Sequence, residues 1–99
     1  MSKEALDILQ QSAPIFAMLQ DENRQQILLM LCQTGPQSVK QITDKMKLSR
    51  PAVSHHLKLL LDQNLVSVKK NGTERKYAVT LQPAIVLLKQ LTQALEDQL

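Results

Sequence analysis

Between residues 38 and 81, two short helices joined by a tight connection lead directly into an alternating hairpin. Ser38 and Ser49 are each good N-caps, and Pro51 is tolerated in the first turn of the second helix. The apolar residues of the first helix are Val39, Ile42 and Met46. Two short helices connected in this way are typical of a helix-turn-helix, which we expect over residues 38–61.

The hairpin is expected over residues 65–81. The alternating apolar positions of its two strands are Val66, Val68, Tyr77, Val79 and Leu81. Between the strands, Asn71-Gly72 is the pair preferred by a type I′ turn, in which both central residues have φ > 0. The segment therefore has the form of a two-stranded wing behind the helix-turn-helix.

Further helices are expected on both sides of this unit, two before it and one after it. Asp21 to Asn23 supplies a cap for a core helix whose apolar run is Ile27, Leu28, Met30 and Leu31. Upstream, Leu6, Leu9 and Ala13 recur at helical spacing until Pro14 removes a backbone donor, which predicts two helical pieces with a kink. Pro83 opens a last amphipathic helix.

The terminal segments, residues 1–20 and 83–99, are candidates for a dimer surface. The last helix could pack on its own core, but few partners remain for its stripe in so short a chain. We therefore expect a homodimer. The predicted interface residues are Leu6, Leu9, Ile85, Leu88, Leu91 and Leu95.

The chain of 99 residues is long enough for one domain, residues 1–99, and too short for two independent cores. The expected architecture is mainly α with a small β-hairpin, about five helices plus a two-stranded wing. Apolar residues are almost all aliphatic, since Phe16 and Tyr77 are the only aromatics. Such a core is thin, which again favours an oligomer.

Positive charge is concentrated in the middle of the chain. Residues 40–76 contain nine basic and three acidic side chains, a net charge of +6, whereas the remainder carries −3. Lysine and arginine gain affinity for polyanions by displacing counterions from phosphates. Charge alone is equally compatible with a solvated lysine-rich face.

The second helix of the helix-turn-helix has two distinct sides. Val53, Leu57 and Leu60 define a buried side. The opposite, polar side consists of Arg50, Pro51, Ser54, His55 and Lys58. A major groove admits such a helix, so we expect the residues of its first turns to contact bases and the lysine one turn further on to contact phosphate. His56 lies beside the apolar side and is expected to be a half-buried packing residue rather than a metal ligand.

The tip of the hairpin adds four cations to the candidate DNA-binding residues, Lys69, Lys70, Arg75 and Lys76. A basic loop of this kind can lie against a phosphate backbone or reach into a minor groove. The alternative is an edge hairpin kept soluble by its lysines.

At these residues the sequence resembles the ArsR/SmtB family of winged-helix repressors. The segments that carry the resemblance are residues 48–60 (LSRPAVSHHLKLL), 64–66 (NLV) and 70–77 (KNGTERKY), with the upstream Asp-Glu-Asn-Arg at 21–24. The resemblance spans roughly residues 15–81. It implies a homodimer, with its first and last helices at the interface, that represses by occupying a pseudo-palindromic operator on double-stranded DNA.

Departures from the family pattern are equally informative. Where many members carry paired metal-sensing cysteines, this chain is best aligned with Ser38 and Lys40, and its last helix has no histidine. We therefore expect no metal site and no cofactor, and no residue pattern names an effector. The turn also departs, because Lys47 stands where glycine is frequent, and a lysine at φ > 0 is strained.

Other classes of function are weaker. The chain lacks a nucleophile-base pair, a phosphate-binding glycine loop and a carboxylate dyad, so we do not expect an enzyme. No apolar run approaches the length of a membrane span, and with one cysteine and no signal segment we expect a cytoplasmic protein. A winged-helix protein-interaction module that does not bind DNA remains an alternative.

Cys32 presents a further alternative, a one-cysteine redox switch that controls repression. Its place at the end of the apolar run 27–31 favours instead a buried, inert thiol.

Overall fold

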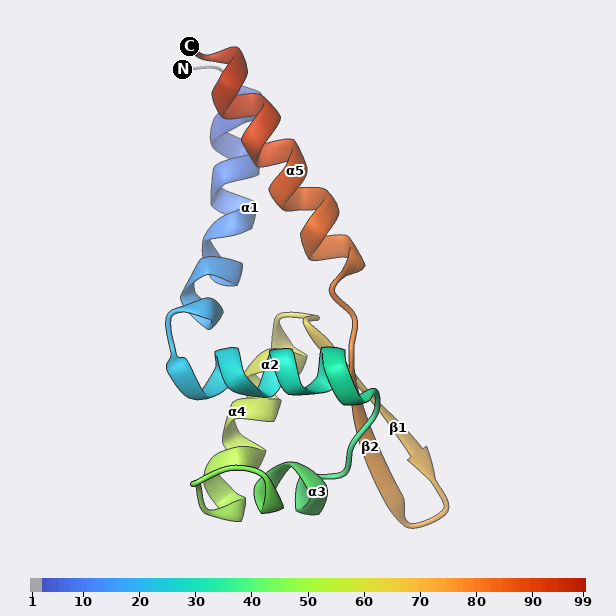
Figure 1. Cartoon of the computed structure of the whole chain (residues 1–99). Helices are drawn as coiled ribbons and strands as arrows, with labels where there is room; N and C mark the ends of the chain where they lie inside the picture. The colour runs from blue at the N-terminus through green and yellow to red at the C-terminus, as the bar shows by residue number, and fades with distance from the viewer. Residues whose placement is uncertain (1–2) are drawn as a thin grey trace.

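The computed structural model describes residues 3–99. Its elements, in chain order, are α1 (Lys3–Leu19), α2 (Glu22–Thr34), α3 (Val39–Asp44), α4 (Arg50–Asp62), β1 (Val66–Asn71), β2 (Glu74–Val79) and α5 (Gln82–Asp97). The described part of the chain thus contains five helices and one two-stranded antiparallel sheet (Figure 1). The predicted fold class, a mainly helical winged helix-turn-helix, is confirmed.

The hydrophobic core lies where α2, α3, α4 and the base of the hairpin meet. Its fully enclosed side chains are Ile27, Leu31, Ile42, Val53, Leu57, Leu60 and Leu65. The predicted buried side of α4 is confirmed, since three of its residues have no exposed surface. Each helix contributes one apolar stripe, which leaves the opposite face of α4 in solvent.

Side-chain caps set the starts of the three central helices. Asp21, Ser38 and Ser49 each accept a hydrogen bond from the backbone N–H three residues later. At Ser38 the arrangement is reciprocal, because the Gln41 side chain also accepts from the Ser38 N–H at 2.8 Å. The helix starts expected from these residues are confirmed.

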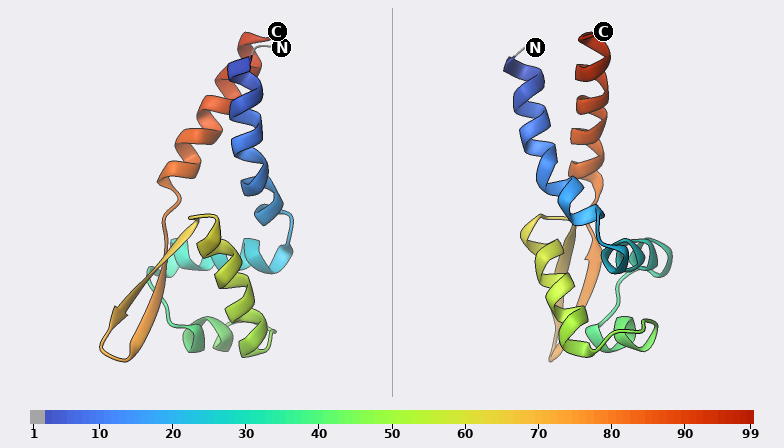
Figure 2. Two further views of the ribbon diagram at one scale, coloured as in Figure 1. Left: turned by 180° about the vertical axis from the view of Figure 1, so that it is seen from behind. Right: turned by 90° about the vertical axis from the view of Figure 1, so that its left-hand side faces the viewer.

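Helices α1 and α5 pack against each other and extend away from this core, with the start of α1 near the end of α5 (Figures 1 and 2). The radius of gyration is 15.6 Å, against about 12.6 Å for a compact domain of this length. The accessible surface is 6697 Å², against about 5,700 Å² for a compact monomer of this mass. The chain with its extended helix pair is therefore less compact, and exposes more surface, than a closed single domain of this size.

The expected interruption of the first helix at Pro14 is wrong. Helix α1 runs as one helix from Lys3 to Leu19, with Pro14 inside it. A proline removes one backbone hydrogen bond, but the turn around it is held by Ser12 and Ile15, both buried. The Ser12 hydroxyl donates to the carbonyl of Ile8 at 2.8 Å, which gives the buried oxygen a partner. The burial of Ser12 and Ile15 therefore compensates for the backbone hydrogen bond that is lost at Pro14.

The expectation about the hairpin turn is wrong. Asn71 belongs to β1 and pairs with Glu74, so the connecting residues are Gly72 and Thr73. Only Gly72 has positive φ, at 67°, and glycine at the first central position is the mark of a type II′ turn rather than type I′. Lys47 avoids the strained region altogether: the one non-glycine residue with positive φ among residues 3–99 is Asn64, at 57°.

Candidate nucleic-acid interface

The polar side of α4 is fully presented to solvent. Arg50, Pro51, Ser54, His55 and Lys58 are all exposed. The buried side of the helix fastens it to the core, and the Ser49 hydroxyl accepts the Ala52 N–H at 3.3 Å to begin it. Cationic and hydrogen-bonding side chains are therefore carried on a rigid, capped helix, as groove recognition requires.

The charges on this face are not neutralised within the chain. The single salt bridge among the described residues joins Lys40 and Asp44 along α3, at 3.5 Å and with both side chains largely exposed. Arg50 and Lys58 take part in no ion pair there. Their full positive charge is available to an anionic partner.

The hairpin places like charges directly opposite one another. Lys69 faces Lys76 and Lys70 faces Arg75 in adjacent rungs of the antiparallel ladder. Because side chains alternate across a sheet, one cationic pair lies on each face of the ribbon. Lys76 is half-buried and the other three are exposed. Opposed like charges destabilise a free hairpin. No acidic side chain of the described residues pairs with these four cations. A bound anion would therefore reduce the repulsion between them.

The wing is tied to the helix-turn-helix by backbone hydrogen bonds. Gln37, just before α3, and Tyr77 of β2 donate N–H groups to each other's carbonyls at 3.0 and 2.7 Å. Within the wing itself, the Thr80 N–H donates to the Leu65 carbonyl at 3.0 Å and closes the base of the hairpin. The cationic ribbon is thus held in a defined position relative to α3 and α4.

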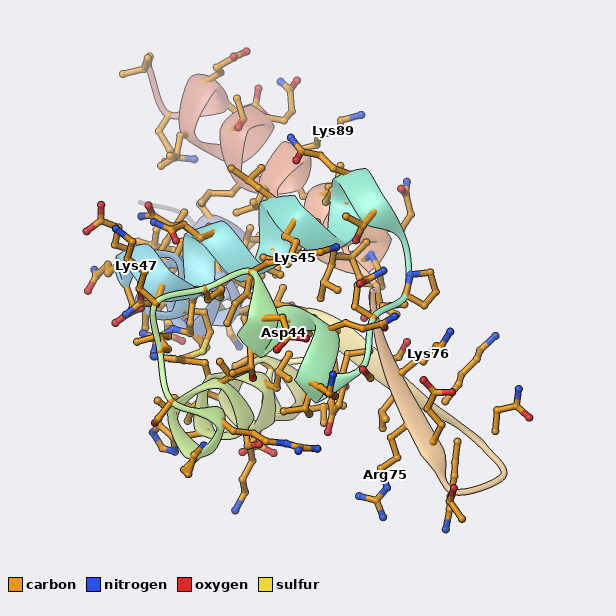
Figure 3. All side chains as sticks on the ribbon, turned by 60° about the horizontal axis from the view of Figure 1, so that its bottom comes forward. Asp44, Lys45, Lys47, Arg75, Lys76 and Lys89 are labelled. Carbon is orange, nitrogen blue, oxygen red and sulfur yellow. The ribbon has the colours of Figure 1, made fainter. Side chains whose placement is uncertain are left out.

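Two lysines that were not among the candidate DNA-binding residues also belong to this end of the molecule. Lys45 and Lys47 are exposed on the connection between α3 and α4, while Arg75 and Lys76 project from the wing (Figure 3). The Lys45 ammonium donates to the Gln37 side-chain carbonyl at 3.3 Å. The signal that could have identified them is their position in the turn of a helix-turn-helix, directly before its second helix.

His56 is half-buried, as expected, but it also has a polar role that the sequence did not suggest. The Arg24 Nη1 atom lies 3.3 Å from the His56 Nδ1 atom. The Arg24 backbone N–H donates to the Asp21 carboxylate and lowers the pKa of Asp21 below its ordinary value, and the nearby charge of the Arg24 guanidinium acts in the same direction. The ring of the exposed His55 lies 6.1 Å from that of His56, centroid to centroid.

The candidate dimer residues divide into two groups. Leu6, Leu9, Ile85 and Leu95 are 36 to 47% exposed. Leu88 is half-buried, and Leu91 is buried against its own chain at 6% exposure, so Leu91 belongs to the intrachain packing of α1 and α5 rather than to an open surface. Most other large exposed apolar side chains also lie on these helices or at their end: Phe16, Leu19, Val86 and Leu99.

The expectation of a buried Cys32 is wrong. Its side chain is exposed, because the apolar stripe of α2 that enters the core is Ile27, Leu28 and Leu31, and Cys32 lies one position beyond it. The thiol borders an apolar groove of about 460 Å³ formed by α1, α2 and α5, beside Leu29 and Ile85.

Among the described residues, 3–99, two kinds of feature are absent: a metal-ligand cluster and an apolar helix long enough to span a membrane. No group of three or more histidine, cysteine, aspartate or glutamate side chains is arranged to hold a metal ion there. Within the same residues, no helix combines the length and apolar character needed to cross a bilayer.

A capped helix with a free polar side, preceded by a second short helix and followed by a cationic hairpin, defines a winged helix-turn-helix protein of the regulatory class. Residues 21–68 match the family model described as bacterial regulatory protein, arsR family. The chain is also 32% identical over 77 residues to the arsenical resistance operon repressor of Bacillus subtilis, a match that covers 78% of this chain and 73% of that protein. The chain belongs to the arsR family.

Solved structures agree with this assignment. An ArsR-like transcriptional regulator from Rhodococcus is similar with a TM-score of 0.81 and 28% identity, over 91% of this chain and 84% of that one. A homodimeric winged helix-turn-helix DNA-binding domain from Mycobacterium bovis is similar with a TM-score of 0.72 and 26% identity, over 99% and 89% of the two chains. The family model itself stops inside β1, so the terminal helices are compared only by these longer matches.

Proposed function

We propose that this protein is a homodimeric transcriptional repressor that binds a pseudo-palindromic operator through α4 and the wing, without a bound metal. The first turns of α4 read bases: Arg50 is suited to guanine, whose two acceptors match a bidentate guanidinium, and Ser54 and His55 contact bases or phosphates. Lys58 and the four wing cations hold the backbone. The role consists of binding and requires no catalytic step.

The observation that carries the proposal is the uncompensated positive charge of α4 and the wing. Arg50 and Lys58 have no acidic partner, and the wing opposes lysine to lysine and lysine to arginine across its strands. A chain that maintains such repulsion in the free state gains most by meeting a polyanion. Neutral protein surfaces would leave these charges unpaired, which disfavours a protein-interaction module.

The dimer is supported by the exposed apolar side chains of α1 and α5. Leu6, Leu9 and Phe16 recur along one side of α1 while Ala5, Ser12 and Ile15 are buried on another. The exposed residues Leu6, Leu9 and Phe16 are therefore available to pack against a second copy of the chain. The relative from Mycobacterium bovis, described as homodimeric, is consistent with this arrangement.

Selection of bound sequences from a randomised duplex library, repeated at two salt concentrations, tests the proposal. We expect an enriched pseudo-palindrome whose half-sites lie about one helical turn apart. Its affinity should fall steeply with salt, by about 0.9 log units per phosphate contact for each decade. Failure to enrich any sequence, together with salt-independent binding, would contradict the proposal.

The variant Arg50→Ala then tests base reading. It should lose about 1 to 3 kcal/mol of discrimination at one base pair of each half-site. Lys89→Gln on α5 is the matched control, since this exposed lysine lies on the terminal helix pair and should leave both affinity and preference unchanged. Equal loss on every sequence would instead assign Arg50 to the phosphate backbone.

A redox-responsive form of the same repressor is a second candidate, favoured by the exposure of Cys32. Exposed thiols can form mixed disulfides or pair across a dimer. Operator binding by wild type and Cys32→Ser is to be compared before and after treatment with a mild oxidant. An identical response of the two proteins would eliminate this candidate.

A further inference from the structure

The side chain of Arg24, at the start of α2, is attached to the end of the preceding helix. Its Nε donates to the Met18 carbonyl at 2.9 Å, and its Nη2 donates to the Ala17 carbonyl at 3.5 Å. The last carbonyls of a helix lack intrahelical partners and carry its partial negative charge. Helix α1 has no basic residue in its own last turn, so Arg24 supplies the missing cation.

The remaining arm of the same guanidinium reaches α4. Its Nη1 lies 3.3 Å from the His56 Nδ1 atom, across 32 positions of sequence. A guanidinium has only donors, so the Nδ1 atom is the acceptor and the imidazole carries its proton on Nε2. His56 lies on α4 between the buried Leu57 and the exposed His55. This bond therefore holds α4 at a residue next to the side that we propose to face DNA.

Arg24 is itself held in place at the N-terminus of α2. Its backbone N–H donates to the Asp21 Oδ1 atom at 3.0 Å, which caps the helix and puts a carboxylate near the guanidinium. Arg24 and Asp21 are both half-buried. One residue thus joins three helices: α1 through two carbonyls, α2 through its own backbone and α4 through an imidazole.

We infer that Arg24 and His56 are positioning residues that set the orientation of α4 relative to α1. The inference rests on the proposed function: α1 carries part of the self-association surface, and α4 carries the base-reading side chains. In a dimer, each protomer contributes one α4. The link makes the spacing and tilt of these two helices depend on the position of α1 in the dimer interface. Neither residue touches DNA.

The test compares His56→Leu, which removes the acceptor at similar volume, with His56→Gln, whose side-chain carbonyl can still accept from Arg24. We expect His56→Leu to bind the selected duplex about tenfold more weakly, the size of one lost charge-assisted hydrogen bond. Its salt dependence should match that of wild type, because no phosphate contact is lost. His56→Gln should recover most of the affinity.

A contrasting variant separates positioning from direct contact. Lys58→Gln should reduce the slope of log affinity against log salt by about 1, as the loss of one phosphate contact predicts. All variants are to be compared at a temperature where denaturation curves show each protein to be fully folded. Wild-type affinity in His56→Leu, or a reduced salt slope in that variant, would overturn the inference.

A measurement without DNA keeps the inference distinct from the proposed function. Nitrogen-15 spectra of the imidazoles should show the His56 Nδ1 atom as an unprotonated acceptor in wild type and altered in Arg24→Gln. Amide hydrogen exchange should rise in α4 of His56→Leu while α5 stays unchanged. If wild type binds no duplex, the proposed function fails, and unchanged exchange in α4 would then overturn the positioning role as well.

Discussion

The central body of the protein and its terminal helix pair use apolar residues in opposite ways. In the body, α2, α3, α4 and the hairpin close their leucine, isoleucine and valine side chains around one core and leave charge outside. In the pair, α1 and α5 bury Ala5, Ser12 and Leu91 between or beside them, yet they keep a second apolar side in solvent.

The difference shows which partner each region fits. The core of the body is closed within one chain, with Ile15 of α1 contributing to it, and its uncompensated cationic surface fits a polyanion. A helix pair that leaves large apolar side chains uncovered fits another apolar surface. Stability and DNA recognition should therefore be separable from self-association by mutation.

The largest expected effect comes from the core. Leu57→Ala removes a side chain with no exposed surface from α4 and should lower the free energy of unfolding by about 2 to 5 kcal/mol. Urea denaturation measures the change. The control is Leu29→Ala, where the side chain is 63% exposed and the loss should be much smaller. Equal losses at the two leucines would contradict the division of the molecule drawn above.

Self-association should respond to the opposite set of residues. The double variant Leu9→Glu, Leu95→Glu places charges on the exposed apolar side of α1 and α5 and should weaken dimerisation about tenfold or more, at least ~1.4 kcal/mol. Sedimentation at several concentrations measures the dissociation constant. Val68→Glu, an exposed apolar position on the wing, is the control and should leave it unchanged. A dimer that tolerates the double variant would place the interface elsewhere.

The cap at Asp21 gives a smaller, pH-dependent effect. Asp21→Ala should cost about 1 kcal/mol of stability at neutral pH. Because the folded pKa of Asp21 is lowered, the ionic part of this contribution is fully present above the unfolded-state pKa of about 3.9. It is lost as pH falls through the lower folded value, so wild type and variant should converge in acid.

Asp44→Ala is the matched control for that measurement, since Asp44 forms only an exposed ion pair with Lys40. Pairs of this kind contribute about 0 to 1 kcal/mol. Thermal denaturation of both variants between neutral and acidic pH provides the comparison. A stability difference at Asp21 that does not change down to pH ~2 would rule out the ionised carboxylate as the cap.

The smallest effect should have opposite signs in two assays. Lys69→Gln relieves the repulsion from Lys76 across the hairpin and should stabilise the free protein by about 0.2 to 1 kcal/mol. The same change should reduce the salt slope of DNA binding by about 1. Lys89→Gln on α5 should alter neither quantity. A Lys69→Gln protein that is no more stable than wild type would remove the repulsion argument for the wing.

Much of the body was predictable because its signals are local. Ser38 and Ser49 indicate where α3 and α4 begin, because each caps its own helix. The spacing of Val53, Leu57 and Leu60 predicts the buried side of α4. The exposed polar side of α4 follows from the same periodicity. The hairpin was predicted by alternation, although its turn was assigned to the wrong pair of residues.

What failed depended on contacts between distant segments. Pro14 was expected to interrupt α1, but packing around Ser12 and Ile15 keeps the helix continuous. Cys32 directly follows an apolar run, yet the rotation of α2 against the core leaves the thiol exposed. The sequence also offered no signal for Arg24 and His56, because two residues 32 positions apart become partners only when α2 and α4 cross.

By itself, then, the sequence determined the order of elements, the cationic middle of the chain and the two-sided character of α4, since each depends on residues within a few turns of one another. Tertiary structure alone decided which side of α1 and α5 is buried within the chain and which side stays exposed to solvent. It also decided that like charges face each other across the wing, and that a single arginine joins three helices. Those outcomes depend on the rotation and register of packed elements, which periodicity in one segment does not specify.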